Sequence, residues 1–286
     1  MFSAFDLSIS KKLFRGLKKY NNYGYNDINH YSKIGKKESA KFKKPNLNKY
    51  ISRILDDNSL KAADIEDSWF PNIEADVFIS HSHMDEELAT AFAGFLIEEM
   101  GLKVFVDSLA WGNIADLLEQ VNSKYSDKRH NMTGGFLYDH EKCIKASQHV
   151  IIMLMMALNK MIDSTESVFF LNTAQSINAI AGNSISETYS PWIYGELTCV
   201  NTIRRRQLCR KTILSESVSL NSSLIHQDSS PELVVSYPVD MKSLTKLEED
   251  DVIKWMEKYR EHKNSDVNSL DYLYELHSEV TEYYGF

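Results

Sequence analysis

The sequence predicts an α/β fold in which a central parallel five-stranded sheet carries helices on both faces. Short apolar runs alternate with segments of helical periodicity from about residue 75 onward, and this alternation is typical of β-α-β units. Two of the runs are continuously apolar, as expected for strands that are buried on both faces. The chain has 286 residues and a hydrophobic content of 43%, which is enough for a sizeable core.

The predicted elements follow one another in a regular order. Five segments have the short length and the β-branched or aromatic composition of strands: Asp76–Ser80, Lys103–Asp107, His149–Leu154, Ser167–Leu171 and Glu232–Ser236. A helix is predicted from Met84 to Gly101, because apolar residues recur on one face and glycine favours a helix end. Further helical segments are predicted at about 114–125, 138–147, 155–163, 191–206, 243–262 and 267–280.

Residues 1–72 differ from the rest and are predicted to be a basic N-terminal extension to a domain at 73–286. Residues 1–70 hold 14 Lys and Arg against 8 Asp and Glu, whereas the remainder holds 18 against 32. An acidic body does not suit a protein that wraps duplex DNA. The basic segment, with a predicted amphipathic helix near Lys11, is expected to pack on the acidic domain or on a partner protein rather than on nucleic acid.

The three cysteines form no C-x-x-C pair, which argues for a reducing compartment and against a disulfide framework or a zinc knuckle. No apolar run approaches the length of about 18 residues that a membrane span requires. The first residues also lack the apolar segment of a secretory signal. These features predict a cytoplasmic protein without a membrane span.

The stretch HSHMD at 81–85 resembles the H-x-H-x-D box of metal-dependent hydrolases. In metallo-β-lactamase-like hydrolases a His follows the Asp, whereas this chain has Glu86 and then a helical segment instead of a Gly-rich loop. Ser82 and Asp85 have the spacing of a capping box. We therefore predict a turn between a strand and a capped helix, with no bound metal.

Three stretches together resemble a Toll/interleukin-1 receptor (TIR) domain of the bacterial anti-phage defence type. They are DVFISHS at 76–82, GLKVFVDSLAWGN at 101–113 and SPWIYGEL at 190–197. In TIR domains the first strand ends in Phe-Ile-Ser, a mobile BB loop follows the second strand, and many enzymatic members carry Ser-x-Trp-x-x-x-Glu-Leu on a later helix. The resemblance covers roughly residues 74–262 and implies a flavodoxin-like fold.

The resemblance also implies that the chain cleaves NAD+ between nicotinamide and ribose, with Glu196 as the catalytic residue. Ser190 is a good N-cap and Pro191 suits the first helical position. Trp192 and Glu196 are then one turn apart on the same helix face. A carboxylate there can stabilise an oxocarbenium-like transition state and hydrogen-bond the ribose hydroxyls. NAD+ is the substrate, and no separate cofactor is implied.

Further substrate contacts follow from the same resemblance, at Ser80, His81, Ser82, Asp107, Trp111 and Trp192. The three residues that end the first strand lie where TIR enzymes contact the ribose and phosphates, although this chain lacks the Arg that animal and plant members often have there. Trp111, in the BB loop, is a candidate for stacking on a base. Asp107 is a candidate for orienting the loop or a ribose.

The predicted function is therefore that of an NAD+ hydrolase or cyclase in bacterial immunity, which yields ADP-ribose or a cyclic ADP-ribose signal. The expected partners are NAD+, further copies of the chain through TIR–TIR contacts, and an effector or phage-derived activator, but no nucleic acid. Two alternatives stay open: a non-catalytic TIR scaffold for signalling assembly, and a nucleoside-processing enzyme related to deoxyribosyltransferases. The sequence does not choose among the products.

Overall fold

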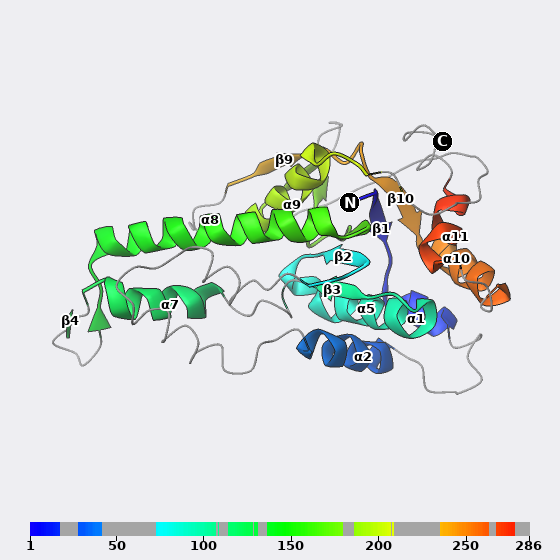
Figure 1. Cartoon of the computed structure of the whole chain (residues 1–286), viewed down its shortest axis with the longest axis horizontal. Coiled ribbons are helices and arrows are strands. Elements are labelled where there is room, and N and C mark those ends of the chain that lie inside the picture. The colour runs from blue at the N-terminus through cyan, green and yellow to red at the C-terminus, as the bar shows by residue number, and fades with distance from the viewer. Residues whose placement is uncertain are drawn as a thin grey trace. The chain divides into compact units, whose positions relative to one another are not determined.

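We analysed a computed structural model of the chain (Figure 1). It describes residues 1–17, 28–41, 73–106, 108, 114–127, 129–130, 136–179, 186–206, 208, 235–262 and 267–277. The chain forms two compact units. The first comprises Met1–Ser39, Glu74–Val106 and Ile162–Phe286, and the second comprises Ala40–Ile73 and Asp107–Met161.

A five-stranded sheet of parallel strands forms the centre of the first unit, which confirms the predicted α/β fold. Its strands are β1 (Ser3–Ser8), β2 (Val77–Ser80), β3 (Val104–Val106), β6 (Ser167–Leu171) and β10 (Thr245–Glu248). The spatial order is β10-β1-β6-β2-β3. Flavodoxin-like sheets have the strand order 2-1-3-4-5. If β2 is counted as the first strand, then β3, β2 and β6 take the places 2, 1 and 3. The fourth place is taken by the N-terminal strand β1, and the fifth by β10.

Three of the five predicted strands are confirmed as β2, β3 and β6. The prediction of a strand at His149–Leu154 was wrong, because these residues lie inside helix α8 (His140–Ser164). The run from Val150 to Leu158 is apolar at every position, and periodicity alone does not separate a buried strand from a buried helix in such a run. Of the last predicted strand, Glu232–Ser236, residues 232–234 lie outside the described ranges, and Val235 and Ser236 precede β9 without being part of a strand.

The two strands that the sequence analysis missed are β1 and β10. Ser3–Ser8 were predicted to belong to an extension outside the domain, but the structure places them between β6 and β10 in the sheet. The predicted boundary at residue 72 therefore does not separate the sheet from what precedes it. Helix α10 (Glu249–Glu261) begins later than the predicted start at 243, because Thr245–Glu248 form β10 instead.

Helices α1 (Lys11–Leu17) and α2 (Ile28–Ala40) also belong to the first unit. Helix α2 crosses α5 (Glu86–Met100) at two glycines (Figure 1). A Cβ added at Gly94 would lie 1.9 Å from the carbonyl oxygen of Tyr31, and one at Gly35 would lie 2.1 Å from that of Thr90. The backbones of the two helices thus approach so closely that only glycine fits at either position.

The first face of the sheet carries aromatic side chains from both strands and helices. Phe169 of β6 stacks on Phe5 of β1, with ring centroids 5.2 Å apart, and on Trp255 of α10 at 6.1 Å. Phe92 of α5 meets Phe169 edge-on at 5.7 Å. Tyr274 of α11 (Ser269–Leu276) stacks parallel to Phe5. These contacts place α5, α10 and α11 on one face of the sheet.

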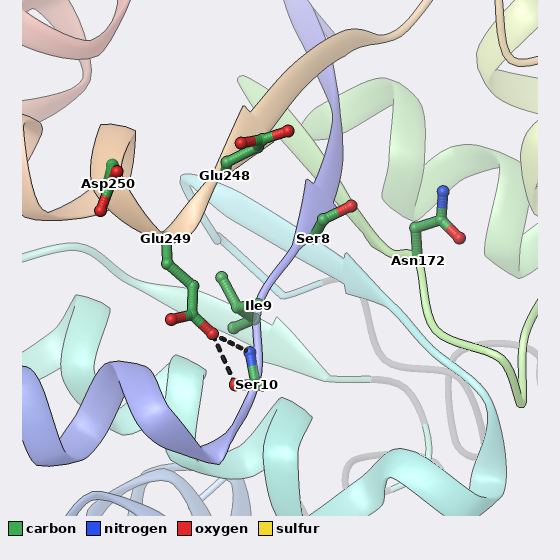
Figure 2. A pocket seen from close by; sticks show the side chains of 7 residues that line it. All are labelled: Ser8, Ile9, Ser10, Asn172, Glu248, Glu249 and Asp250. Atoms are coloured by element: carbon green, nitrogen blue, oxygen red, sulfur yellow. Dashed lines mark hydrogen bonds between the residues drawn. The ribbon is translucent and has the colours of Figure 1, made fainter. Parts of the chain in front are cut away.

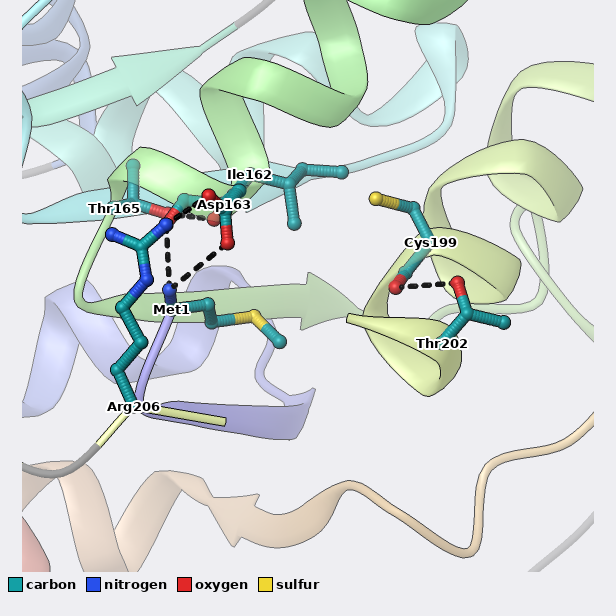
Figure 3. Close-up of polar contacts among 7 residues, drawn as sticks. All are labelled: Met1, Ile162, Asp163, Thr165, Cys199, Thr202 and Arg206. Carbon is teal, nitrogen blue, oxygen red and sulfur yellow. Dashed lines mark hydrogen bonds and ion pairs between the residues drawn. The ribbon is translucent and has the colours of Figure 1, made fainter. Parts of the chain in front are cut away.

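The second face is covered by α9 (Pro191–Thr202), which contacts Ser80 at the end of β2. The start of β1 is anchored by the end of α8 and by the residues that follow α9 (Figure 3). The α-amino group of Met1 donates to the carbonyl oxygen of Asp163 at 2.6 Å, and the backbone N–H of Arg206 donates to the carbonyl of Met1 at 2.9 Å. Burial, together with the charge of Arg206, lowers the pKa of this α-amino group to about 6.

Two helix ends follow from single residues that the sequence analysis singled out. Gly101 ends α5 in the left-handed conformation, with φ of 69°, and its N–H donates to the carbonyl of Leu96. Ser190 caps α9, accepting a hydrogen bond from the N–H of Ile193 at 3.3 Å, and Pro191 follows it. Both predicted helix ends are confirmed, for the physical reasons expected.

Smaller elements complete the description. An antiparallel sheet in the first unit contains β7 (Asn178–Ala179), β8 (Ser186–Thr188) and β9 (Tyr237–Val239). The second unit contains α7 (Ile114–Tyr125), the short antiparallel pair β4 (Arg129–His130) and β5 (Phe136–Leu137), and most of α8. Among the described helices, none combines the length and the apolar composition needed to cross a membrane.

Candidate functional site

Ser80 and Glu196, which are 116 residues apart in the sequence, meet on the second face of the sheet. Ser80 is the last residue of β2, and its hydroxyl donates a hydrogen bond to Oε2 of Glu196 on α9. Both side chains are buried, with exposed fractions of 1% and 2%. The contact brings together two of the residues that the sequence analysis placed in one site.

The position of Glu196 follows from how α9 begins and packs. The Ser190 cap and Pro191 fix the first turn, so that the carboxylate lies on the second turn, facing the sheet. Ile193, Leu197 and Val200 of the same helix are buried as well. Trp192, one turn before Glu196, is half-buried. The apolar side chains of α9 thus pack the helix against the sheet. The carboxylate of Glu196 lies on the same buried side of the helix.

The residues after Ser80 form a tight turn into α5. His81 is buried, and Ser82 accepts a hydrogen bond from the N–H of Met84 at 3.4 Å, at the start of a 3-10 turn over 83–85. Asp85 accepts a hydrogen bond from Thr173 Oγ1 at 2.5 Å. Ser82 therefore caps the 3-10 turn through Met84 and not through the predicted capping box with Asp85, whose carboxylate instead ties the loop after β2 to the loop after β6.

Two of the predicted substrate contacts belong to the predicted BB loop. Asp107 and Trp111 lie outside the described residues, so their prediction as substrate contacts stays a prediction. Within the described ranges, no three side chains of His, Cys, Asp or Glu come together as metal ligands, and His81, His83 and Asp85 form no such group. The sequence-based expectation that the chain binds no metal also remains a prediction.

Sequence reasoning missed the polar residues that β1 contributes. Asp6 is 8% exposed, and its Oδ1 accepts a hydrogen bond from the Asn172 amide at 2.8 Å. Burial raises the pKa of Asp6, while the Asn172 hydrogen bond and the charge of Lys246 lower it. A signal was present, because residues 5–10 alternate strictly between apolar and polar, the pattern of a half-buried strand.

A pocket of about 470 Å³ opens beyond the carboxyl ends of β1, β6 and β10 (Figure 2). The described residues that line it are Ser8, Ile9, Ser10, Asn172, Glu248, Glu249 and Asp250. Glu249 accepts hydrogen bonds from the N–H and the hydroxyl of Ser10, at 2.7 and 2.6 Å. In open α/β sheets, ligands bind beyond this edge of the sheet.

The arrangement can supply one buried carboxylate with a hydroxyl beside it, at the edge where such folds bind ligands. A carboxylate held in low dielectric interacts strongly with developing positive charge. Because Glu196 is almost fully buried, a ligand reaches it only after the surrounding side chains or α9 move. Comparison with protein-family models, with curated proteins and with solved structures gave no match for this chain.

Proposed function

We propose that the protein is a cytoplasmic NAD+ nucleosidase of the TIR type, which acts in bacterial immunity. The observation that carries the proposal is the hydrogen bond between Ser80 and Glu196. The TIR resemblance names these two residues from separate motifs, and the fold brings them together at the carboxyl end of a parallel sheet.

In the proposed reaction the bond between nicotinamide and the ribose C1′ breaks, and the electron pair leaves with nicotinamide. The leaving group starts as a cation and departs neutral, so it needs no proton. Positive charge develops on the ribose, and the Glu196 carboxylate stabilises that charge. Ser80 orients the carboxylate. Attack by water yields ADP-ribose and a proton, whereas attack by an atom of the adenosine half yields a cyclic product.

Burial of Glu196 implies a conformational step before the reaction. With an exposed fraction of 2%, the carboxylate cannot contact a ligand of the size of NAD+ without displacement of its neighbours. We expect low basal activity that rises when copies of the chain associate, or when an effector or phage-derived activator binds. A dilution series of the purified protein tests this expectation, since a turnover rate per molecule that is independent of concentration contradicts it.

The test of the function is Glu196→Gln, which keeps the size of the side chain and can still accept from Ser80. Loss of the charge should raise the activation free energy of NAD+ cleavage by about 3–4 kcal/mol, which lowers the turnover rate by about two to three powers of ten. The measurement is chromatography of the products and a thermal melt of both proteins. Glu261→Gln, an exposed change at the end of α10, is the matched control and should leave turnover unchanged.

A scaffold without catalysis is the second candidate. The observation that favours it is a set of exposed apolar side chains on α8, of which Ile152 is 59% and Met156 49% exposed. Exposed apolar surface marks interaction sites. A chain that assembles in solution but turns over no NAD+ at any concentration is a scaffold, and Glu196→Gln then leaves assembly intact.

A further inference from the structure

Helix α9 and the small antiparallel sheet of β7, β8 and β9 are joined along the length of the helix (Figure 1). In the first turn of α9, the ring of Tyr194 stacks on that of Tyr237 in β9, with centroids 4.9 Å apart. Near the end of α9, the Asn201 amide donates a hydrogen bond to the carbonyl oxygen of Asp240, the residue after β9, at 2.9 Å. These contacts make one body of α9, β7, β8 and β9, which we call the α9 flap.

The α9 flap is held on the five-stranded sheet by apolar side chains and by a buried carboxylate. Ile193, Leu197 and Val200 are buried on α9, and Glu196 on the same helix accepts a hydrogen bond from Ser80 at the end of β2. Burying a carboxylate costs free energy, even where a hydroxyl donates to it. The contact between α9 and the sheet is therefore weaker than one made by apolar side chains alone.

The chain that follows α9 is anchored independently of the helix. Ile203 leaves the helix with an extended backbone, at φ of −66° and ψ of 135°. Beyond it, the N–H of Arg206 donates to the carbonyl oxygen of Met1 at 2.9 Å, and its guanidinium forms an ion pair with Asp163. Hinges are a few residues at the end of an element that absorb a change in backbone angles. The residues from Ile203 to Arg205 have this place in the α9 flap.

We propose that the α9 flap opens as one unit away from the second face of the sheet, about the residues from Ile203 to Arg205, while the five-stranded sheet stays folded. Proteins open locally in cooperative units, often supersecondary motifs, at a lower free energy than that of unfolding as a whole. Opening breaks the hydrogen bond between Ser80 and Glu196 and exposes both side chains at the carboxyl end of β2. That the open state admits NAD+ rests on the proposed function, whereas the opening itself requires no ligand.

Cys199 reports on the opening, because it lies about one turn after Glu196 on the buried side of α9. The residue is 5% exposed, and burial raises the pKa of its thiol to about 12. Since the thiolate is the reactive form, Cys199 should react with Ellman's reagent only in the open state. The measurement is the rate of this reaction in the full chain with Cys143→Ser and Cys209→Ser, so that Cys199 is its only thiol.

Cys199 should react at least tenfold faster than global unfolding allows, and its rate should depend less on urea, because the opening exposes less surface. Ser80→Ala should raise the rate by about ten- to a hundredfold, the usual range for a hydrogen bond to a charged group. The matched control is Ser167→Ala, which also removes a buried strand hydroxyl, bonded to Ser3 at 3.0 Å on the first face. It should lower the global stability and leave the rate of Cys199 unchanged.

Native-state hydrogen exchange tests whether the α9 flap moves as one unit. The amides of α9 and of β8 should exchange through one opening, with the same free energy, whereas those of β2 and β6 should exchange only on global unfolding. Both measurements are made without NAD+, so neither depends on catalysis.

The proposal is overturned if Cys199 reacts only at the rate and with the urea dependence of global unfolding. It is also overturned if Ser167→Ala accelerates the reaction as much as Ser80→Ala does, or if the amides of α9 and β8 open with different free energies. Opening of the flap in a chain that turns over no NAD+ supports this inference and contradicts only the proposed function. Turnover of NAD+ by a chain whose flap stays closed contradicts this inference and leaves the proposed function standing.

Discussion

The two faces of the central sheet are built from alternate residues of the same strands, yet their polar groups differ in kind. On the first face, polar side chains gather at the amino end, where the hydroxyl of Ser3 is hydrogen-bonded to Ser167 at 3.0 Å and to Tyr274 at 3.3 Å. The hydroxyls of this cluster are neutral, and the carboxylate that they are seen to contact among the described residues is the half-buried Glu166, which accepts from Tyr274 at 2.9 Å. On the second face, the polar side chains lie toward the carboxyl end and include the carboxylates of Asp6 and Glu196.

This difference separates what stabilises the fold from what the fold can bind. Neutral hydroxyls that pair with one another cost little when buried. Buried carboxylates are costly, and α/β folds place ligands at the carboxyl edge of the sheet. We infer that the first face is structural and that the carboxyl end of the second face is functional. Substitutions on each face test this inference.

The largest effect on stability is expected on the first face, from Phe169→Ala. Phe169 is fully buried and contacts the rings of Phe5, Phe92 and Trp255. Its removal leaves a cavity where strand and helices meet, and should lower the free energy of unfolding by about 3–5 kcal/mol. Urea unfolding followed by circular dichroism measures the loss. A change below about 1 kcal/mol shows that this face is not the structural core.

The second effect concerns the layer beyond the first face, where α2 crosses α5. Gly94→Ala places a methyl group against the carbonyl of Tyr31, and the helices must separate to admit it. The expected loss is about 3 kcal/mol, the upper end of the usual range for overpacking. Gly16→Ala in α1 is the control, because the added Cβ meets nothing nearer than 4.0 Å, and alanine should stabilise that helix by roughly 0.5–1 kcal/mol. Equal melting temperatures for the two variants contradict the close crossing.

The sequence predicts the strands in the middle of the chain and misses those near its two ends. Strands β2, β3 and β6 carry β-branched and aromatic runs and were predicted. β10, at Thr245–Glu248, is short and polar, and its pairing with β1 is a tertiary effect that no local pattern reveals. β1 was missed although its alternation was visible, because the positive charge of the following residues made the segment resemble an extension.

The candidate site divides in the same way. Glu196 and Ser80 were found because each belongs to a motif, and their contact needs the fold. Asp6 and Asn172 belong to no motif, and only strand register brings their side chains into contact. A resemblance that begins near residue 74 could not include a strand supplied by the first eight residues of the chain.

The third predicted effect on stability concerns the second face and the substitution Ser80→Ala. Glu196 loses the hydroxyl that donates to its carboxylate, and weakening the solvation of a buried charge should cost about 2 kcal/mol of stability. A double-mutant cycle with Glu196→Gln isolates the contact, because the cost of Ser80→Ala should shrink when the charge is gone. If Ser80→Ala costs the same in both backgrounds, the hydroxyl does not serve the carboxylate.

The smallest effect, and the one of opposite sign, is expected for Asp6→Asn. Burial raises the pKa of Asp6 in the folded chain above the usual value of 3.8, which applies to the unfolded chain. At pH values between the unfolded pKa and the folded pKa, the folded chain therefore binds more protons than the unfolded chain. Stability contributed at this site is therefore present below the unfolded pKa and is lost as pH rises through the folded pKa. Asparagine does not titrate and can still accept from the Asn172 amide, so Asp6→Asn should gain stability relative to the parent as pH rises from about 4 to 7. Unfolding free energies of both proteins across that range give the measurement, with Asp76→Asn as the control that should show no such gain. If Asp6→Asn instead loses stability at pH 7, the carboxylate serves the fold, and the second face is structural at its carboxyl end as well.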